Sequence, residues 1–166
     1  MDAAELPGAG MVTSTMTVDV ARAREIAAGV VDPEIPVLSI AELGILRDVR
    51  SVADRIVVTI TPTYSGCPAM QQIEDDVRSA LTSAGCGEVE VQIVHSPAWT
   101  TDWISPEGHR KLASFGIAPP SHVDDVLCPR CESAAPKMVS RFGSTACKAL
   151  MVCVSCGEPF DHFKEF

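Results

Sequence analysis

The amino-acid sequence predicts an α+β protein: a small α/β domain with the element order α-β-β-α-β-α, followed by a β-rich module that a metal ion holds together. Three observations predict this fold. Helical and strand-like hydrophobic patterns alternate over residues 17–117. A proline-rich stretch at 118–121 then interrupts the pattern. Two Cys-x-x-Cys pairs, at 128–131 and 153–156, lie beyond it with 21 residues between them.

Each helix of the α/β domain has its own signal. Thr17 is expected to cap a first helix, which ends before Pro33 because the residue preceding a proline avoids the helical region. The second helix, over 68–85, starts at a proline, carries an apolar stripe and ends at a glycine. The third is expected over 106–116, between a serine-proline cap and a glycine.

Strands are expected where β-branched residues alternate with polar ones. The first two follow a short helical turn with a capping-box pattern, and they form a hairpin. The third has one wet and one buried face, and the last two belong to the metal module. The five segments are 45–50, 55–61, 88–94, 137–142 and 150–154.

The chain has 166 residues and a net charge of -9, which is unevenly distributed. Residues 1–127 carry 8 Lys and Arg against 18 Asp and Glu, whereas residues 128–166 carry 5 against 4. An acidic body repels a phosphate backbone, and the metal module offers no basic stripe with interleaved aromatic residues. Nucleic acid is therefore not an expected partner. No apolar run approaches the roughly 18 residues of a membrane span, so a membrane is not expected either.

These patterns divide the chain into four regions. Residues 1–16 are predicted to be a disordered leader, because they lack the basic residues of a signal peptide. Residues 17–117 form the α/β domain, 118–127 a stiff linker, and 128–166 the metal module. Seven cysteines, an odd number, indicate a reducing, cytoplasmic location, where Cys-x-x-Cys pairs bind metals more often than they form structural disulfides.

The paired cysteines are expected to bind a structural Zn²⁺ ion. Two Cys-x-x-Cys pairs supply four soft donors that meet in a tetrahedron when a hairpin brings them together. An iron or iron–sulfur centre with the same ligands, and cysteines without a metal, are the alternatives. His162 lies close enough in the sequence to replace a ligand, and Cys147 is either a small buried residue or a fifth thiol beside the metal. The four predicted ligands are Cys128, Cys131, Cys153 and Cys156.

Cys67 is the strongest candidate for chemistry outside the metal module. It lies where a strand is followed by the helix that starts at Pro68. Unpaired amide groups and the helix dipole stabilise a thiolate at such a position, so the sequence predicts a lowered pKa for Cys67. The structural alternative is a small buried cysteine that fills the start of the helix.

Two further segments each have a functional and a structural interpretation. Asp32 and Glu34 lie on a loop pinned by prolines, which suits metal ligands or acid–base groups, although an acidic stretch after a helix is usually solvated. Trp99 and Trp103 lie close together in a chain with only 5% aromatic residues. They form either a surface for a partner protein or part of the core.

These residues resemble those of a known family. The segments 32–36 and 43–45, and the pattern Thr63-x-x-x-Cys67-Pro68 within 63–68, are similar to the iron–sulfur cluster assembly domain of SufT-type maturation proteins. The metal module, at 142–149 and 159–164, is similar to the zinc ribbon of the D-subunit family of phenylacetyl-CoA epoxidases. The combination of both parts is more specific than either part alone.

The resemblance implies a small α/β fold in which Cys67 is the reactive thiol and a transient ligand of iron–sulfur clusters, with Asp32, Glu34 and Thr63 beside it. It implies an accessory subunit of the phenylacetyl-CoA epoxidase complex in aerobic phenylacetate degradation, which acts in the assembly or maturation of a metal centre and is not itself the catalyst. The expected partners are subunits of that complex, either its iron–sulfur reductase or its di-iron oxygenase.

Two other functions remain open at this stage. One is a non-catalytic structural subunit that docks on the oxygenase through residues 99–103. The other is a cysteine-dependent enzyme, for which no base is evident near Cys67 in the sequence.

Overall fold

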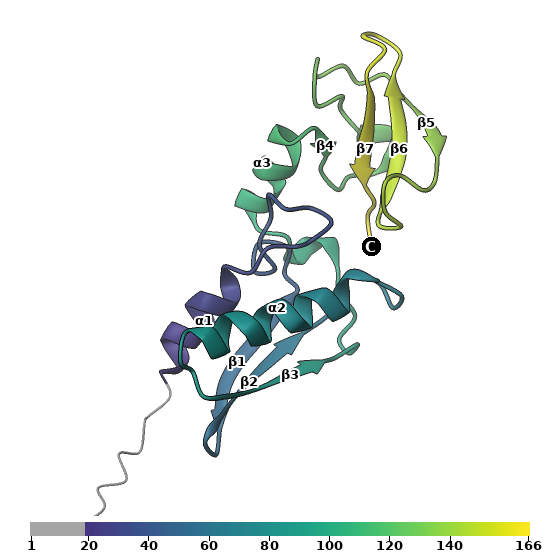
Figure 1. Ribbon diagram of the computed structural model, residues 1–166. Helices are drawn as coiled ribbons and strands as arrows, with labels where there is room; N and C mark the ends of the chain where they lie inside the picture. Colours follow the sequence, from purple (N-terminus) through teal and green to yellow (C-terminus); the bar gives the residue numbers. More distant parts are fainter. Residues whose placement is uncertain (1–18) are drawn as a thin grey trace, which may run out of the picture.

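The computed structural model describes residues 19–166 and confirms the predicted α+β order (Figure 1). The leader expected at 1–16 and the helix cap expected at Thr17 lie outside the described residues. The first helix is capped by Asp19, whose carboxylate accepts a hydrogen bond from the Arg22 amide at 3.1 Å. The elements are α1 Val20–Ala28, β1 Leu46–Val52, β2 Arg55–Ile60, α2 Ala69–Ser83, β3 Glu88–Ile93, α3 Pro106–Ser114, β4 Ile117–Ala118, β5 Pro136–Ser140, β6 Lys148–Cys153 and β7 Pro159–Phe163.

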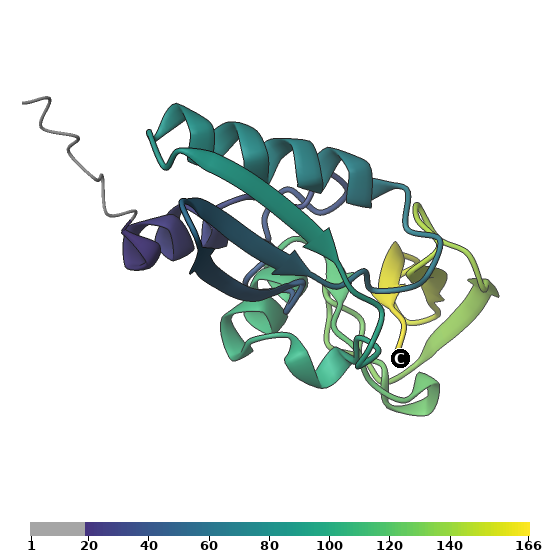
Figure 2. The ribbon, with the colours of Figure 1, turned by 90° about the horizontal axis from the view of Figure 1, so that it is seen from below.

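The first sheet has the strand order β1-β2-β3. β1 and β2 form the predicted antiparallel hairpin, whereas β2 and β3 are parallel because α2 connects them as a crossover. α1 and α2 contact each other and the sheet, and Ile56, Val58 and Ile60 of β2 are fully buried in the same core cluster as residues of both helices. Figure 2 shows α2 lying along the sheet. The central strand therefore carries the core of this layer.

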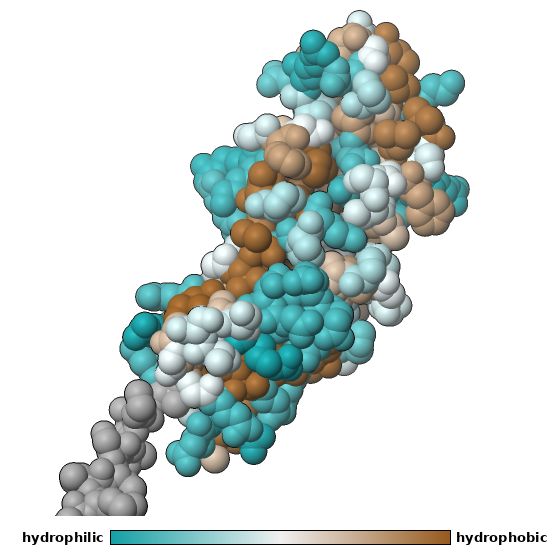
Figure 3. Space-filling view, viewed as in Figure 1, coloured by the Kyte–Doolittle hydropathy of each residue, from teal (hydrophilic) through white to brown (hydrophobic). Residues whose placement is uncertain are grey.

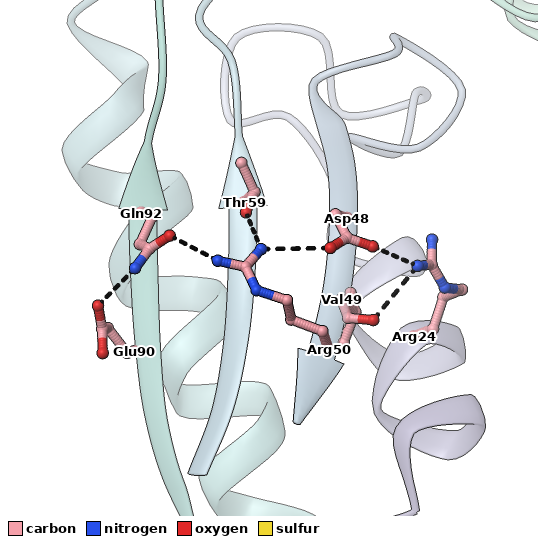
Figure 4. Close-up of polar contacts among 7 residues, drawn as sticks. All are labelled: Arg24, Asp48, Val49, Arg50, Thr59, Glu90 and Gln92. Carbon is pink, nitrogen blue, oxygen red and sulfur yellow. Dashed lines mark hydrogen bonds and ion pairs between the residues drawn. The ribbon is translucent and has the colours of Figure 1, made fainter. Parts of the chain in front are cut away.

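The other face of this sheet is covered by a row of polar side chains (Figure 4). Arg50 of β1 donates to Thr59 of β2 at 3.2 Å and to Gln92 of β3 at 3.1 Å, and so links all three strands. It also donates to Asp48 at 3.2 Å, which accepts a second bond from Arg24 of α1 at 2.9 Å. These groups are about half exposed, so we expect the row to contribute little stability. It marks this face as the solvent-facing one.

The second sheet has the strand order β4-β7-β6-β5. Two strands of this sheet were not predicted from the sequence: β7, which pairs antiparallel with β6, and the two-residue β4, which pairs parallel with β7. The segment expected as a stiff linker, 118–127, is part of this structure. Ala118 lies in β4, and Val126 is 1% exposed in a core cluster with Cys128 and Cys153. Strand pairing and core packing therefore cross the boundaries that the sequence predicts at either end of residues 118–127.

Trp99 joins the second sheet to the first layer. Its side chain is 5% exposed, and its indole N–H donates to the carbonyl of Leu43 at 2.9 Å. Its ring centroid lies 6.1 Å from those of Phe163, at the end of β7, and Phe166. Trp99 is thus a core residue, whereas Trp103 is half buried beneath the Arg47 guanidinium, 3.5 Å from the ring centroid.

Glycine at position 44 is required by a close approach of two backbone segments. The capping box before it forms as predicted, with Ser39 and Glu42 exchanging hydrogen bonds at 2.9 and 3.2 Å, but it closes a turn and not a helix. Gly44 then has a φ of +70°, and a Cβ there would lie 2.5 Å from the Cβ of Trp103 and 2.6 Å from its carbonyl oxygen.

We predict that Gly44→Ala destabilises the protein by about 2–4 kcal/mol, because it adds backbone strain to a clash that side-chain rotation does not relieve. Gly85→Ala is the matched control. Gly85 has a similar φ, +76°, but no heavy atom within 4 Å of the added Cβ, so we expect a cost of about 1 kcal/mol. The measurement is the free energy of unfolding from urea titrations. Equal losses in the two variants would contradict the close-approach argument.

Candidate functional site

The four cysteines predicted as metal ligands lie together. Their sulfur atoms are all within 4.8 Å of one another, with 3.8 Å between Cys128 and Cys156 and 3.6 Å between Cys131 and Cys153. A tetrahedron of sulfurs around an ion at a Zn–S distance of about 2.3 Å has edges of about 3.8 Å. Among residues 19–166, no other group of three or more His, Cys, Asp and Glu side chains meets the same distance criterion. The donor set therefore fits a tetrahedral metal ion.

The two pairs of cysteines have nearly the same backbone. In each, the carbonyl of the first cysteine accepts a hydrogen bond from the residue four positions later, Glu132 to Cys128 and Gly157 to Cys153, both at 2.8 Å. Glu132 and Gly157 both have a positive φ, 58° and 76°. The two Cys-x-x-Cys turns thus have the same local shape, and both place their sulfurs in one cluster.

The second candidate site lies in the loop between β2 and α2. Cys67 is half buried in this loop, directly before Pro68, which takes the N-cap position of α2 without a side-chain hydrogen bond. Thr63, from the same loop, is 9% exposed. The loop lies at the end of the first sheet nearest the second sheet, in both Figure 1 and Figure 2. Cys67 packs against the core cluster that contains Cys147 and Phe163 of the second part, so it lies at the junction of the two parts.

The charges of Asp32 and Glu34 act on Cys67, as the family resemblance leads us to expect, but the two carboxylates are in different environments. Asp32 is 6% exposed, and one of its oxygens accepts the amide hydrogens of Glu34 and Ile35, both at 2.8 Å. Asp32 thus holds the shape of the loop. Glu34 is half-buried, and within residues 19–166 it has no ion-pair partner. Of the two carboxylates, that of Glu34 is therefore the more accessible to a ligand.

The prediction of a lowered pKa for Cys67 was wrong. Burial of the side chain raises the pKa of Cys67 to about 11, with further contributions from the charges of Glu34, Asp32 and Cys147. The Ala69 amide at the start of the helix opposes this shift but does not overcome it. The prediction considered the helix dipole alone. It did not weigh the burial of the side chain or the charges of the carboxylates that the family resemblance places near Cys67.

Two residues left open by the sequence lie away from the metal ligands. Cys147 is 5% exposed and belongs to the core cluster of the first layer, so burial is confirmed and a place beside the metal is excluded. His162, in β7, is 2% exposed and is not among the ligands. It lines a pocket of about 350 Å³ together with Phe142 and Lys164.

No helix within residues 19–166 combines the length and apolarity of a membrane span.

Both parts of the chain match families of known proteins. Residues 22–93 match the family model described as an iron–sulfur cluster assembly protein. Residues 117–164 match the PaaD zinc β-ribbon domain, a range that begins at β4. The chain is also similar to a crystal structure of a domain of unknown function from Bacillus anthracis, with 31% identity, a TM-score of 0.52, and coverage of 56% of this chain and 90% of that one.

Two curated relatives extend these matches. A protein of Escherichia coli (strain K12) named for the D-subunit of 1,2-phenylacetyl-CoA epoxidase is 48% identical over 80% of this chain and 85% of its own length. The Fe-S protein maturation auxiliary factor YitW of Bacillus subtilis (strain 168) is 41% identical over 46% of this chain and 76% of its own. By these similarities, the chain belongs to the D-subunit family of 1,2-phenylacetyl-CoA epoxidases, and in it an iron–sulfur cluster assembly domain precedes a PaaD zinc β-ribbon.

Proposed function

We propose that the protein is an accessory factor of a phenylacetyl-CoA epoxidase and handles iron–sulfur cargo for that complex through Cys67. The observation that carries the proposal is the half-buried Cys67 thiol at the junction of the two parts, beside the carboxylates of Asp32 and Glu34. Membership of the D-subunit family supports the link to the epoxidase. The similarity to Fe-S maturation auxiliary factors supports the cargo.

The residues around Cys67 suit a ligand that holds cargo briefly. Sulfur and carboxylate are both ligands of iron, and thiolate is the usual ligand of iron–sulfur clusters. A thiol with a pKa of about 11 is protonated at neutral pH, so an iron centre has to displace its proton when it binds. Competition with that proton weakens the bond and favours release to a client. The proposed clients are the iron–sulfur reductase and the di-iron oxygenase of the complex.

We further propose that the four-cysteine set holds a structural Zn²⁺ ion. All four positions of the tetrahedron are occupied by protein sulfur, which leaves none for a substrate. The ion would join the 128–131 turn, which precedes β5, to the 153–156 turn between β6 and β7, at the same end of the second sheet. Its role would be to hold this end of the ribbon together.

A structural docking role is the second candidate, and the surface of the ribbon favours it. Apolar side chains gather over the ribbon in Figure 3, and Phe142, Val139 and Val154 are 67%, 59% and 66% exposed. The Trp99 region, by contrast, is used within the chain and is not available to a partner. Docking through the ribbon is compatible with the cargo function, because the two use different surfaces.

For the ribbon, we predict that Cys128→Ser removes the bound zinc and unfolds the second sheet. Metal binding contributes about 10–16 kcal/mol in zinc-finger peptides, and this is folding free energy. The measurements are zinc content after purification and amide hydrogen exchange over β5 to β7. Cys86→Ser, at a buried cysteine after α2, is the control and should keep its zinc. Iron in place of zinc in anaerobically purified protein would overturn the assignment.

For the free thiol, we predict that iodoacetamide labels Cys67 slowly at pH 7. Relative to an ordinary thiol, a pKa of about 11 lowers the thiolate fraction by about 300-fold, and the higher nucleophilicity of a basic thiolate returns about tenfold. We therefore expect labelling about 30-fold slower than for free cysteine. Peptide mapping by mass spectrometry gives the rate as a function of pH. A rate that reaches its plateau below pH 8 would contradict the raised pKa.

The function itself is tested in cells that produce the epoxidase. Cys67→Ser should reduce phenylacetyl-CoA-dependent activity to the level of cells that lack this chain, while its thermal midpoint and zinc content stay unchanged. The Cys86→Ser variant should support full activity. Full activity and full iron content of the epoxidase with Cys67→Ser would rule out the cargo function and leave docking.

A further inference from the structure

We propose that Cys147, which the ribbon contributes, is a second ligand for the cargo held by Cys67, so that one iron-handling site is shared between the two parts of the chain. This inference rests on the proposed function. It assigns to the ribbon a chemical role in addition to its structural one. The two thiols are 80 positions apart in the sequence, so no spacing links them.

Cys147 and the metal ligands lie at opposite ends of one strand. β6 begins at Lys148, directly after Cys147, and ends at Cys153. Cys147 and Cys153 are six residues apart. At about 3.3 Å per strand residue, this places them roughly 20 Å apart along the strand direction. In Figure 1, the start of β6 lies near the β2–α2 loop and its other end points away from the first layer. Cys147 therefore belongs to the Cys67 end of the ribbon.

Packing and hydrogen bonds hold Cys147 in this position. It is buried in the same core cluster as Ile35 and Phe163, and Cys67 packs against that cluster. Its carbonyl accepts the Lys164 amide hydrogen at 2.9 Å, and its sulfur lies 3.0 Å from the hydroxyl of Thr145. These contacts fix the backbone at Cys147, so the thiol stays packed against the first layer.

The same charges act on both thiols. Burial is the main cause of the raised pKa of Cys147, as it is for Cys67, and Glu34 and Asp32 raise the pKa of each. Charge on Cys147 also raises the pKa of Cys67. These shared charge effects, and the packing of Cys67 against the core cluster that contains Cys147, place the two thiols and the two carboxylates in the same part of the fold. No three of these donor atoms lie within 4.8 Å of one another, so the incoming cargo would have to draw them together. A pair of thiols with carboxylates nearby would then be a donor set for iron, whereas either cysteine alone is not.

Lys148 supplies the opposite charge in this cluster. Lys148 is 3% exposed, which is rare for a lysine, and its ammonium nitrogen lies 3.7 Å from a carboxylate oxygen of Asp161. Asp161 also accepts a hydrogen bond from the Ser144 hydroxyl at 2.6 Å, and its oxygen fills the space where a Cβ on Gly143 would lie. The charge of Lys148 acts on Asp32, Glu34 and Cys147. One cation among several acids leaves the cluster anionic, as a site for an iron-containing cation requires.

Ligation at this pair is a proton-for-metal exchange. Each thiol forms one S–Fe bond and gives up one proton, which passes to solvent or to the neighbouring carboxylates. No electrons are transferred, so no oxidant or reductant is needed. Release to a client reverses the exchange.

The first experiment loads the full, zinc-containing chain anaerobically with ferrous iron and sulfide, and measures iron and acid-labile sulfide per chain. We expect Cys67→Ser and Cys147→Ser each to lose most of the bound iron, and the double variant to lose no more. Cys147→Ala removes the thiol without adding a hydroxyl, and Cys86→Ser controls for the loss of a buried thiol elsewhere. Zinc content and thermal midpoint report folding in every variant.

The outcomes separate the two proposals. If Cys67→Ser loses iron and folded Cys147→Ser and Cys147→Ala keep it, the shared site is wrong and the cargo function stands. If no variant loses iron relative to wild type, the cargo function fails as well.

A second experiment uses the wild-type chain and needs no substitution. Phenylarsine oxide condenses with two neighbouring thiols to form two As–S bonds and one water molecule. We expect one arsenic per zinc-containing chain, in a bridge that peptide mapping assigns to Cys67 and Cys147. Absence of arsenic from the folded chain, or a bridge between other cysteines, would overturn the shared site.

Discussion

The two parts of this protein depend on one shared hydrophobic core, and Trp99 lies at its junction. The indole packs against Phe163 and Phe166 of the ribbon, while its N–H is satisfied by the carbonyl of Leu43 in the first layer. A buried indole without that hydrogen bond would carry the desolvation cost of an unpaired donor. The same core includes Cys147. The position of the ribbon thiol relative to Cys67 therefore follows from the packing of an aromatic cluster.

The ribbon is organised around β6, which connects two sites of different character. At one end, four sulfurs within 4.8 Å of one another form a closed set, which suits a structural metal. At the other end, Cys147 and the buried Lys148 meet the loops that carry Cys67 and Asp32. A metal at the first end would restrict the strand that positions the second. A structural ion and an iron-handling site can then coexist in one small ribbon without competing for ligands.

Electrostatics around Cys67 differ from those of an activated nucleophile. A helix N-terminus lowers a thiol pKa when the surroundings are solvated or cationic, but here burial and two carboxylates raise it to about 11. Such a thiol is a poor general nucleophile at neutral pH. It becomes a good ligand only when a metal cation arrives, because the same carboxylates that oppose a thiolate favour a cation. This argues for cargo handling over cysteine-dependent catalysis.

The sequence by itself determined the order of the elements in the α/β domain, the grouping of the four paired cysteines and the thiol before α2, because each depends on local signals: hydrophobic period, Cys-x-x-Cys spacing and a proline at a helix start. It did not determine β7 and β4, whose pairing is non-local, or the pKa of Cys67, which depends on carboxylates from a distant loop. Nor did it place Cys147, which has no motif partner. Only tertiary packing decided that the ribbon brings this thiol within range of Cys67, and Lys148 within range of Asp32 and Glu34, because charge and burial act through space and not along the chain.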